Sequence, residues 1–125
     1  MGNRTTIHTI ALMEDIRSLS SMAIPELFPA REEAFKDYGM PMALPDLEKM
    51  LCRRGYAPAL FYGVFEGDKL VSFTLNCVGS YNGKTTIYDT STGTIEKYRG
   101  RGLATKILEH SFPVLQQAGA EQYLL

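Results

Sequence analysis

The stretch from residue 59 to residue 96 restricts the fold most, because apolar and polar side chains alternate along it and two turn signals divide it. The alternation is clearest over residues 70–78, with Val71, Phe73, Leu75 and Cys77 on one face and Ser72, Thr74 and Asn76 on the other. Gly67-Asp68 favours a turn, and Asn82-Gly83 is typical of a two-residue hairpin. The stretch therefore predicts an antiparallel meander with strands over residues 59–66, 70–78 and 85–96.

The segments on either side of this meander have helical spacing. Residues 14–24 place Ile16, Leu19 and Ala23 three to four residues apart, and Pro25 is expected to end that helix. The expected order is a strand over residues 5–12, helices over 14–24, 28–39 and 44–55, the meander, a helix over 103–119 and a strand over 121–125. This order predicts a single domain over residues 1–125 with a mixed α+β or α/β fold.

The helix expected over residues 103–119 is amphipathic. Its apolar stripe consists of Leu103, Ile107, Val114 and Ala118, with Leu108, Phe112 and Leu115 beside it. Pro113 predicts a kink in this helix, and Gly119 predicts its C-terminal cap. The strand that follows comes after a crossover helix, so we expect it to pair in parallel with the last strand of the meander.

Size, charge and cysteine spacing exclude several classes of function. A chain of 125 residues with a net charge of about -1 has no basic field to draw it onto nucleic acid. It has no apolar run of the roughly 20 residues that span a bilayer. Cys52 and Cys77 match no metal or disulfide spacing, so we expect reduced cysteines, no metal and a cytoplasmic protein.

Residues 98–105, with the sequence YRGRGLAT, lie between an expected strand and an expected helix. The first backbone N–H groups of a helix have no partner, and the helix dipole adds roughly half a positive charge there. Gly100 and Gly102 let the backbone approach an anion closely, Arg99 and Arg101 add charge, and Thr105 adds a hydroxyl. The segment therefore predicts a phosphate-binding loop.

This loop is neither of the common nucleotide-binding loops. The chain has no Gly-x-x-x-x-Gly-Lys-Ser/Thr motif, and Gly-x-Gly-x-x-Gly fails because position 105 is Thr105. A third alternative, an arginine-glycine segment that binds nucleic acid, would need more basic and aromatic neighbours than the loop has.

Residues 94–110, TIEKYRGRGLATKILEH, resemble the acetyl-CoA signature of the GNAT superfamily of N-acyltransferases. The family pattern, Arg/Gln-x-x-Gly-x-Gly/Ala, is met by Arg99, Gly102 and Ala104. The resemblance implies a mixed, mostly antiparallel sheet flanked by helices. It also implies transfer of an acetyl group from acetyl-CoA to a primary amine of a small molecule or peptide, by direct attack of the amine on the thioester.

The resemblance also implies roles for individual residues. A bulge at Thr94 and Ile95 is expected to hydrogen-bond the pantetheine arm, and Asp89 is the nearest carboxylate for a catalytic base. The favoured alternative is that Asp89 is an ordinary polar residue that faces solvent or a hairpin partner. The residues expected to hold the pyrophosphate are Arg99, Gly100, Arg101, Gly102, Leu103, Ala104 and Thr105.

Several alternatives stay open at this stage. Family members usually continue with a further helix and strands, so the chain is expected to be a fragment of a longer acyltransferase that lacks those C-terminal elements. Tyr123 has no assigned role. A non-catalytic acetyl-CoA-binding domain is the alternative function, and a homodimer through the last strand is the expected form of any self-association. Phe35, Tyr38, Tyr56 and Phe61 are expected to line an acceptor groove or to pack in the core.

Overall fold

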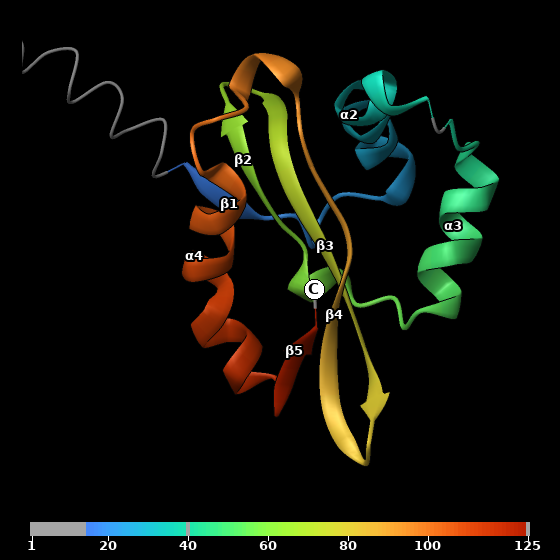
Figure 1. Ribbon diagram of the computed structural model, residues 1–125, viewed down its shortest axis with the longest axis vertical. Coiled ribbons are helices and arrows are strands. Elements are labelled where there is room, and N and C mark those ends of the chain that lie inside the picture. Colours follow the sequence, from blue (N-terminus) through green and yellow to red (C-terminus); the bar gives the residue numbers. More distant parts are fainter. Residues whose placement is uncertain (1–14, 40, 125) are drawn as a thin grey trace, which may run out of the picture.

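The computed structural model describes residues 15–39 and 41–124, and it contains one five-stranded sheet with the strand order β1-β2-β3-β4-β5 (Figure 1). The first four strands are antiparallel, and β5 pairs in parallel with β4. The strands are β1 (Ile16–Ser18), β2 (Tyr62–Glu66), β3 (Lys69–Tyr81), β4 (Lys84–Thr94) and β5 (Gln122–Leu124). The mixed, mostly antiparallel sheet that the sequence predicts is confirmed.

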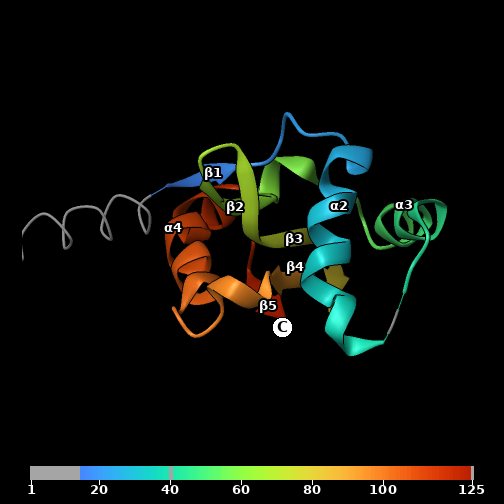
Figure 2. The same cartoon turned by 90° about the horizontal axis from the view of Figure 1, so that it is seen from above.

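Helices cover both faces of this sheet (Figure 2). Helices α2 (Ile24–Phe35) and α3 (Leu44–Arg53) pack on one face, where Phe61, Phe73 and Leu75 are buried with them. Helix α4 (Leu103–Gln117) packs on the other face against Val64 and Val71. Among the described residues, no helix has the length and apolar character needed to cross a bilayer.

The meander forms as expected. Gly67 has a φ of 61°, and Asn82 and Gly83 have φ values of 54° and 74°, so both turns use the left-handed backbone that glycine and asparagine tolerate. Both faces of β3 are covered, so its polar residues Ser72 and Asn76 are as buried as its apolar ones.

The helix expected over residues 14–24 is wrong. Residues 16–18 form strand β1 beside β2, and helix α2 begins only at Ile24. Pro25 lies in the first turn of α2 instead of ending a helix, because the N–H group that proline lacks has no partner at that position. The strand expected over residues 5–12 lies outside the described residues.

The buried stripe of α4 also differs from the expected one. The buried residues of this helix are Leu103, Ile107, Ser111 and Leu115, each four positions after the last, whereas Phe112 and Val114 are exposed. Ser111 can be buried because its hydroxyl donates to the Leu108 carbonyl at 3.2 Å. The helix continues through Pro113, and Gly119 follows its end with a φ of 86°.

Strand β5 pairs with the first part of β4. Among the described residues, the register joins Thr86 to Gln122 and Tyr88 to Leu124. Glu121 secures the start of β5, because its carboxylate accepts the Thr85 N–H at 3.0 Å and its own N–H donates to the Thr85 carbonyl at 2.9 Å. Residues 89–94 of β4 lie between the described pairs with β5 and the glycine loop.

Candidate functional site

The glycine loop joins the end of β4 to the start of α4. The 3₁₀ turn Glu96–Tyr98 follows β4, and Gly100 and Gly102 then take φ values of 77° and 69°. A Cβ atom added at either glycine would meet no atom within 4 Å. Glycine is therefore required here by the backbone conformation, and the space in front of the loop is open.

The first backbone N–H groups of α4, those of Leu103, Ala104 and Thr105, have no intrahelical partner. The first helical bond of α4 runs from the Lys106 N–H to the Gly102 carbonyl, whereas the Arg99 N–H is already bonded to the Glu96 carbonyl. The first turn of α4 contains no acidic residue that would neutralise the helix dipole. The loop is thus a concave set of donors suited to an anion with several oxygens.

The two loop arginines point in different directions. The Arg99 guanidinium donates to the Thr94 carbonyl (3.0 Å), the Asp37 carboxylate (3.1 Å) and the Ala34 carbonyl (2.8 Å). Arg101 is exposed, and its guanidinium carbon lies 5.1 Å from the centre of the Tyr98 ring. The Arg101 guanidinium is therefore accessible to a ligand, whereas the Arg99 guanidinium is hydrogen-bonded within the protein.

A bulge occurs in β4, but not where the sequence predicts it. Thr94 pairs with Ser72 in an unbroken register, and the register slips by one residue between the pairs Leu75–Ser91 and Asn76–Asp89. Thr90 is therefore the extra residue. Ile95 lies beyond the strand, where its N–H donates to the Val71 carbonyl at 2.9 Å.

The bulge places Asp89 in a cluster of polar side chains. The Thr92 hydroxyl donates to the Asp89 carboxylate at 2.6 Å, across the bulge. On the neighbouring strands, the Tyr123 hydroxyl donates to the Asn76 side-chain oxygen at 2.7 Å, and the Asn76 amide donates to the Leu60 carbonyl at 2.8 Å. Asn76 is 1% exposed, so it holds the Tyr123 hydroxyl in a fixed place.

The environment of the Tyr123 hydroxyl could not be predicted from the sequence. Burial, and secondarily the negative charge of Asp89, raise the pKa of its hydroxyl well above the ordinary value. The hydroxyl therefore stays protonated and acts as a donor. This could not be read from the sequence, because it depends on pairing between residues 76, 89 and 123 from three strands.

The four aromatic residues expected at an acceptor groove do not form one group. Phe61 is fully buried with Tyr56 edge-on to it, their ring centres 5.6 Å apart, so Phe61 packs in the core. Phe35 lies between Tyr38 and Phe73, and Tyr38 is more than half exposed.

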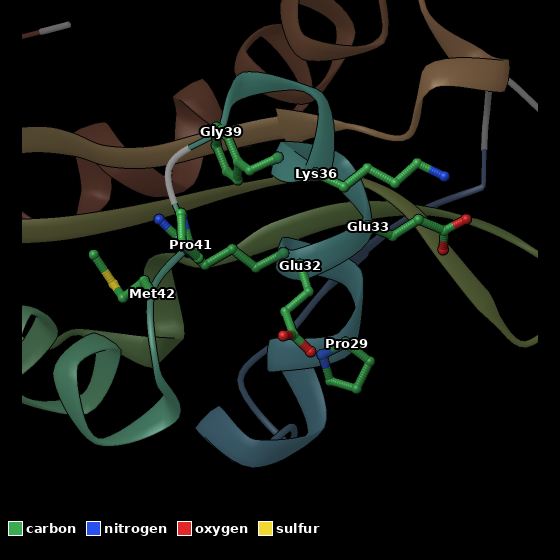
Figure 3. A pocket seen from close by; sticks show the side chains of 9 residues that line it. Pro29, Glu32, Glu33, Lys36, Gly39, Pro41 and Met42 are labelled. Carbon is green, nitrogen blue, oxygen red and sulfur yellow. The ribbon is translucent and has the colours of Figure 1, made fainter.

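Phe35 also lines a pocket of about 570 Å³ between α2 and the residues Gly39, Pro41 and Met42 (Figure 3). Glu32, Glu33 and Lys36 contribute charged side chains to it, and no residue of the glycine loop lines it. Within residues 15–39 and 41–124, no three histidine, cysteine, aspartate or glutamate side chains lie close enough together to hold a metal ion.

The fold is similar to those of solved acetyltransferases. A GNAT family acetyltransferase from Staphylococcus aureus is 15% identical, with a TM-score of 0.64 over 88% of this chain and 83% of that one. A chain of the NatC complex bound to Gag peptide and CoA is 17% identical, with a TM-score of 0.67 over 87% of this chain and 71% of that one. An aminoglycoside acetyltransferase from an uncultured soil metagenomic sample, in complex with sisomicin, is 16% identical, with a TM-score of 0.63 over 88% and 75%.

At these identities the likeness shows the fold, and this chain has the fold of the GNAT acetyltransferases, as the loop motif predicted. No protein-family model and no curated protein matches the sequence.

Proposed function

We propose that this chain is an N-acetyltransferase that binds acetyl-CoA at the glycine loop and transfers the acetyl group to a primary amine. The observation that carries the proposal is the glycine loop on this fold: Gly100 and Gly102 take positive φ values, and the first N–H groups of α4, those of residues 103–105, have no intrahelical partner. Pyrophosphate oxygens would accept from these groups, and Arg101 and the Thr105 hydroxyl would add to them.

The pantetheine arm would extend along β4 from the loop. The described pairs join Thr86–Tyr88 of β4 to Gln122–Leu124 of β5, on the part of β4 that lies farther from the loop than residues 89–94. Asp89 and Thr94 pair with Asn76 and Ser72, which lie four residues apart on β3, because Thr90 is the extra residue of the bulge. An extended strand advances about 3.3 Å per residue, so Thr94 and Asp89 are separated by roughly 13 Å. This length would separate the phosphate end of the ligand from its thioester end, and the thioester would then lie towards Asp89.

At the thioester, the amine nitrogen would attack the carbonyl carbon directly, and the sulfur would leave with the electrons of the C–S bond. The attacking ammonium must first lose a proton, and Asp89 is the carboxylate placed to take it. The Thr92 hydroxyl, 2.6 Å from that carboxylate, would orient it. The acceptor would be a small-molecule or peptide amine, and the proposal holds equally for a monomer or a homodimer.

Titration calorimetry with acetyl-CoA tests the binding part of the proposal. Gly102→Glu puts a carboxylate in front of the loop and should abolish binding by the folded protein. Gly102→Ala is the matched control, because it brings the same positive-φ strain of about 1 kcal/mol without the charge. A Gly102→Glu variant that binds acetyl-CoA as tightly as wild type would contradict the placement of the pyrophosphate. Release of CoA thiol with a panel of primary amines then separates an enzyme from a non-catalytic acetyl-CoA-binding domain.

A further inference from the structure

Arg99 joins the glycine loop to the opposite face of the sheet. Its guanidinium uses Nε on the Thr94 carbonyl, Nη1 on the Asp37 carboxylate and Nη2 on the Ala34 carbonyl, all between 2.8 and 3.1 Å. Arg99, Ala34, Asp37 and Thr94 together are called the Arg99 clamp here. Every nitrogen of this guanidinium is thus bonded to a protein oxygen.

The partners explain why an arginine fits this place. Ala34 lies in the last turn of α2, where helix carbonyls have no intrahelical partner and the dipole is negative, so a cation is favoured. Asp37 and Tyr38 belong to the 3₁₀ turn that follows α2, and the Tyr38 ring centre lies 5.4 Å from the guanidinium carbon. A planar fork can reach a carboxylate and two carbonyls at once, which a lysine ammonium on a flexible stem does less well.

We propose that Arg99 is a positioning residue rather than a phosphate ligand: it fixes the loop so that the N–H groups of residues 100–105 converge, and the exposed Arg101 supplies the charge that meets the phosphates. The inference rests on the proposed function for the identity of the ligand. The contacts of the clamp itself are all made within the chain.

The role of Asp37 separates this proposal from its opposite. If Arg99 bound phosphate directly, Asp37 would compete for it, and Asp37→Ala would raise the affinity for acetyl-CoA. If Arg99 positions the loop, Asp37→Ala removes one of its supports and lowers the affinity. The sign of the change decides between the two roles.

The experiment measures acetyl-CoA affinity by calorimetry at two salt concentrations for wild type, Arg99→Lys, Asp37→Ala and Arg101→Ala, after circular dichroism has established that each is folded. We expect Arg99→Lys to weaken binding about tenfold, since the charge remains but the fork is lost. We expect Asp37→Ala to weaken binding about two- to fivefold, as for a partly exposed ion pair. Arg101→Ala should weaken binding and flatten its salt dependence.

A second readout needs no ligand. The N–H groups of Tyr98, Arg99 and Lys106 are bonded to backbone carbonyls on either side of the open donors, so their hydrogen exchange reports on the loop conformation. Exchange should be faster in Arg99→Lys than in wild type and unchanged in Arg101→Ala.

Tighter binding by Asp37→Ala, or wild-type exchange and affinity in Arg99→Lys, would overturn the positioning role. A wild-type protein that does not bind acetyl-CoA would instead refute the proposed function, and the exchange measurement would still decide whether the clamp holds the loop.

Discussion

Asn76 shows how a buried polar residue can organise this site. Its amide donates to the Leu60 carbonyl and its oxygen accepts the Tyr123 hydroxyl, so both ends of the side chain are satisfied at 1% exposure. The bond crosses from β3 to β5, past the Asp89 position on β4. Asn76 therefore fixes the Tyr123 hydroxyl in the same cluster as Asp89.

The raised pKa of Tyr123 makes the stability of the fold depend on pH in the alkaline range. In the unfolded chain this hydroxyl ionises near pH 10, whereas in the folded chain it keeps its proton to higher pH. The unfolded state then binds fewer protons than the folded state, so stability falls as pH rises above about 10. Urea unfolding between pH 8 and pH 11 should show a larger loss for wild type than for Tyr123→Phe. Parallel pH profiles for the two proteins would contradict this.

Residue-level features divide into those that the sequence predicts and those that it does not. The conformations of Gly100 and Gly102 follow from their type and place, since a strand-to-helix turn with two glycines uses positive φ. The inward direction of Arg99 does not follow, because its partners Ala34 and Asp37 are more than 60 positions away along the chain. The burial of the Tyr123 hydroxyl and its bond to Asn76 cannot be predicted for the same reason, since the two residues are 47 positions apart.

At the scale of elements, α4 is the clearest case of a helix whose buried face differs from its most apolar one. A step of four residues repeats almost the same direction around a helix, so Leu103, Ile107, Ser111 and Leu115 form one line facing the sheet. Reading the stripe from apolar residues alone passes over Ser111 and includes Phe112, which is 45% exposed. The apolar pattern therefore predicts that these residues form a helix. Which side of the helix is buried depends on how it is rotated about its own axis against the sheet.

This rotation gives a stability prediction for α4. Ile107 is fully buried, so Ile107→Ala should lower the free energy of unfolding by about 2–5 kcal/mol. Phe112→Ala should change it by less than about 1 kcal/mol, although phenylalanine is the larger side chain. Chemical denaturation of both variants measures the two values. Equal losses would mean that α4 is rotated towards the apolar stripe that the sequence predicts.

Prolines show why element boundaries were harder to predict than element types. Pro25 favours a boundary, but a proline is compatible with the end of one segment or the first turn of the next helix. In the structure it opens α2, and the short pairing of β1 with β2 occupies the residues before it. The Asn82-Gly83 hairpin was predictable because this dipeptide strongly favours a two-residue β-turn, and strand-like segments lie directly on both sides of it.

At the scale of the whole molecule, β4 connects the features that the proposed function needs. Its end leads into the glycine loop, its middle carries the bulge with Asp89, and its first part pairs with β5. Helix α4 returns from the loop on one face, while α2 contacts the loop through Arg99 from the other (Figure 2). In the proposed function, donor binding and amine activation therefore occur at different points along β4.

This separation predicts that binding and turnover respond to different substitutions. Asp89→Asn keeps the size and hydrogen-bonding capacity of the side chain but removes its basicity, so acetyl-CoA affinity should stay within about twofold of wild type. The rate of amine acetylation should fall about 10²- to 10⁴-fold, the usual contribution of a general base. Gly102→Glu should instead abolish acetyl-CoA binding and turnover together, so the affinity distinguishes the two variants.

The measurement is calorimetry for affinity and CoA release for turnover, with Thr92→Val as the matched control that keeps the carboxylate but loses its 2.6 Å partner. Because Thr92 only orients Asp89, its loss should cost less turnover than Asp89→Asn. An Asp89→Asn protein that acetylates amines at the wild-type rate would remove Asp89 from the mechanism. The donor site at the loop would stand independently of that result, since it rests on residues at the other end of β4.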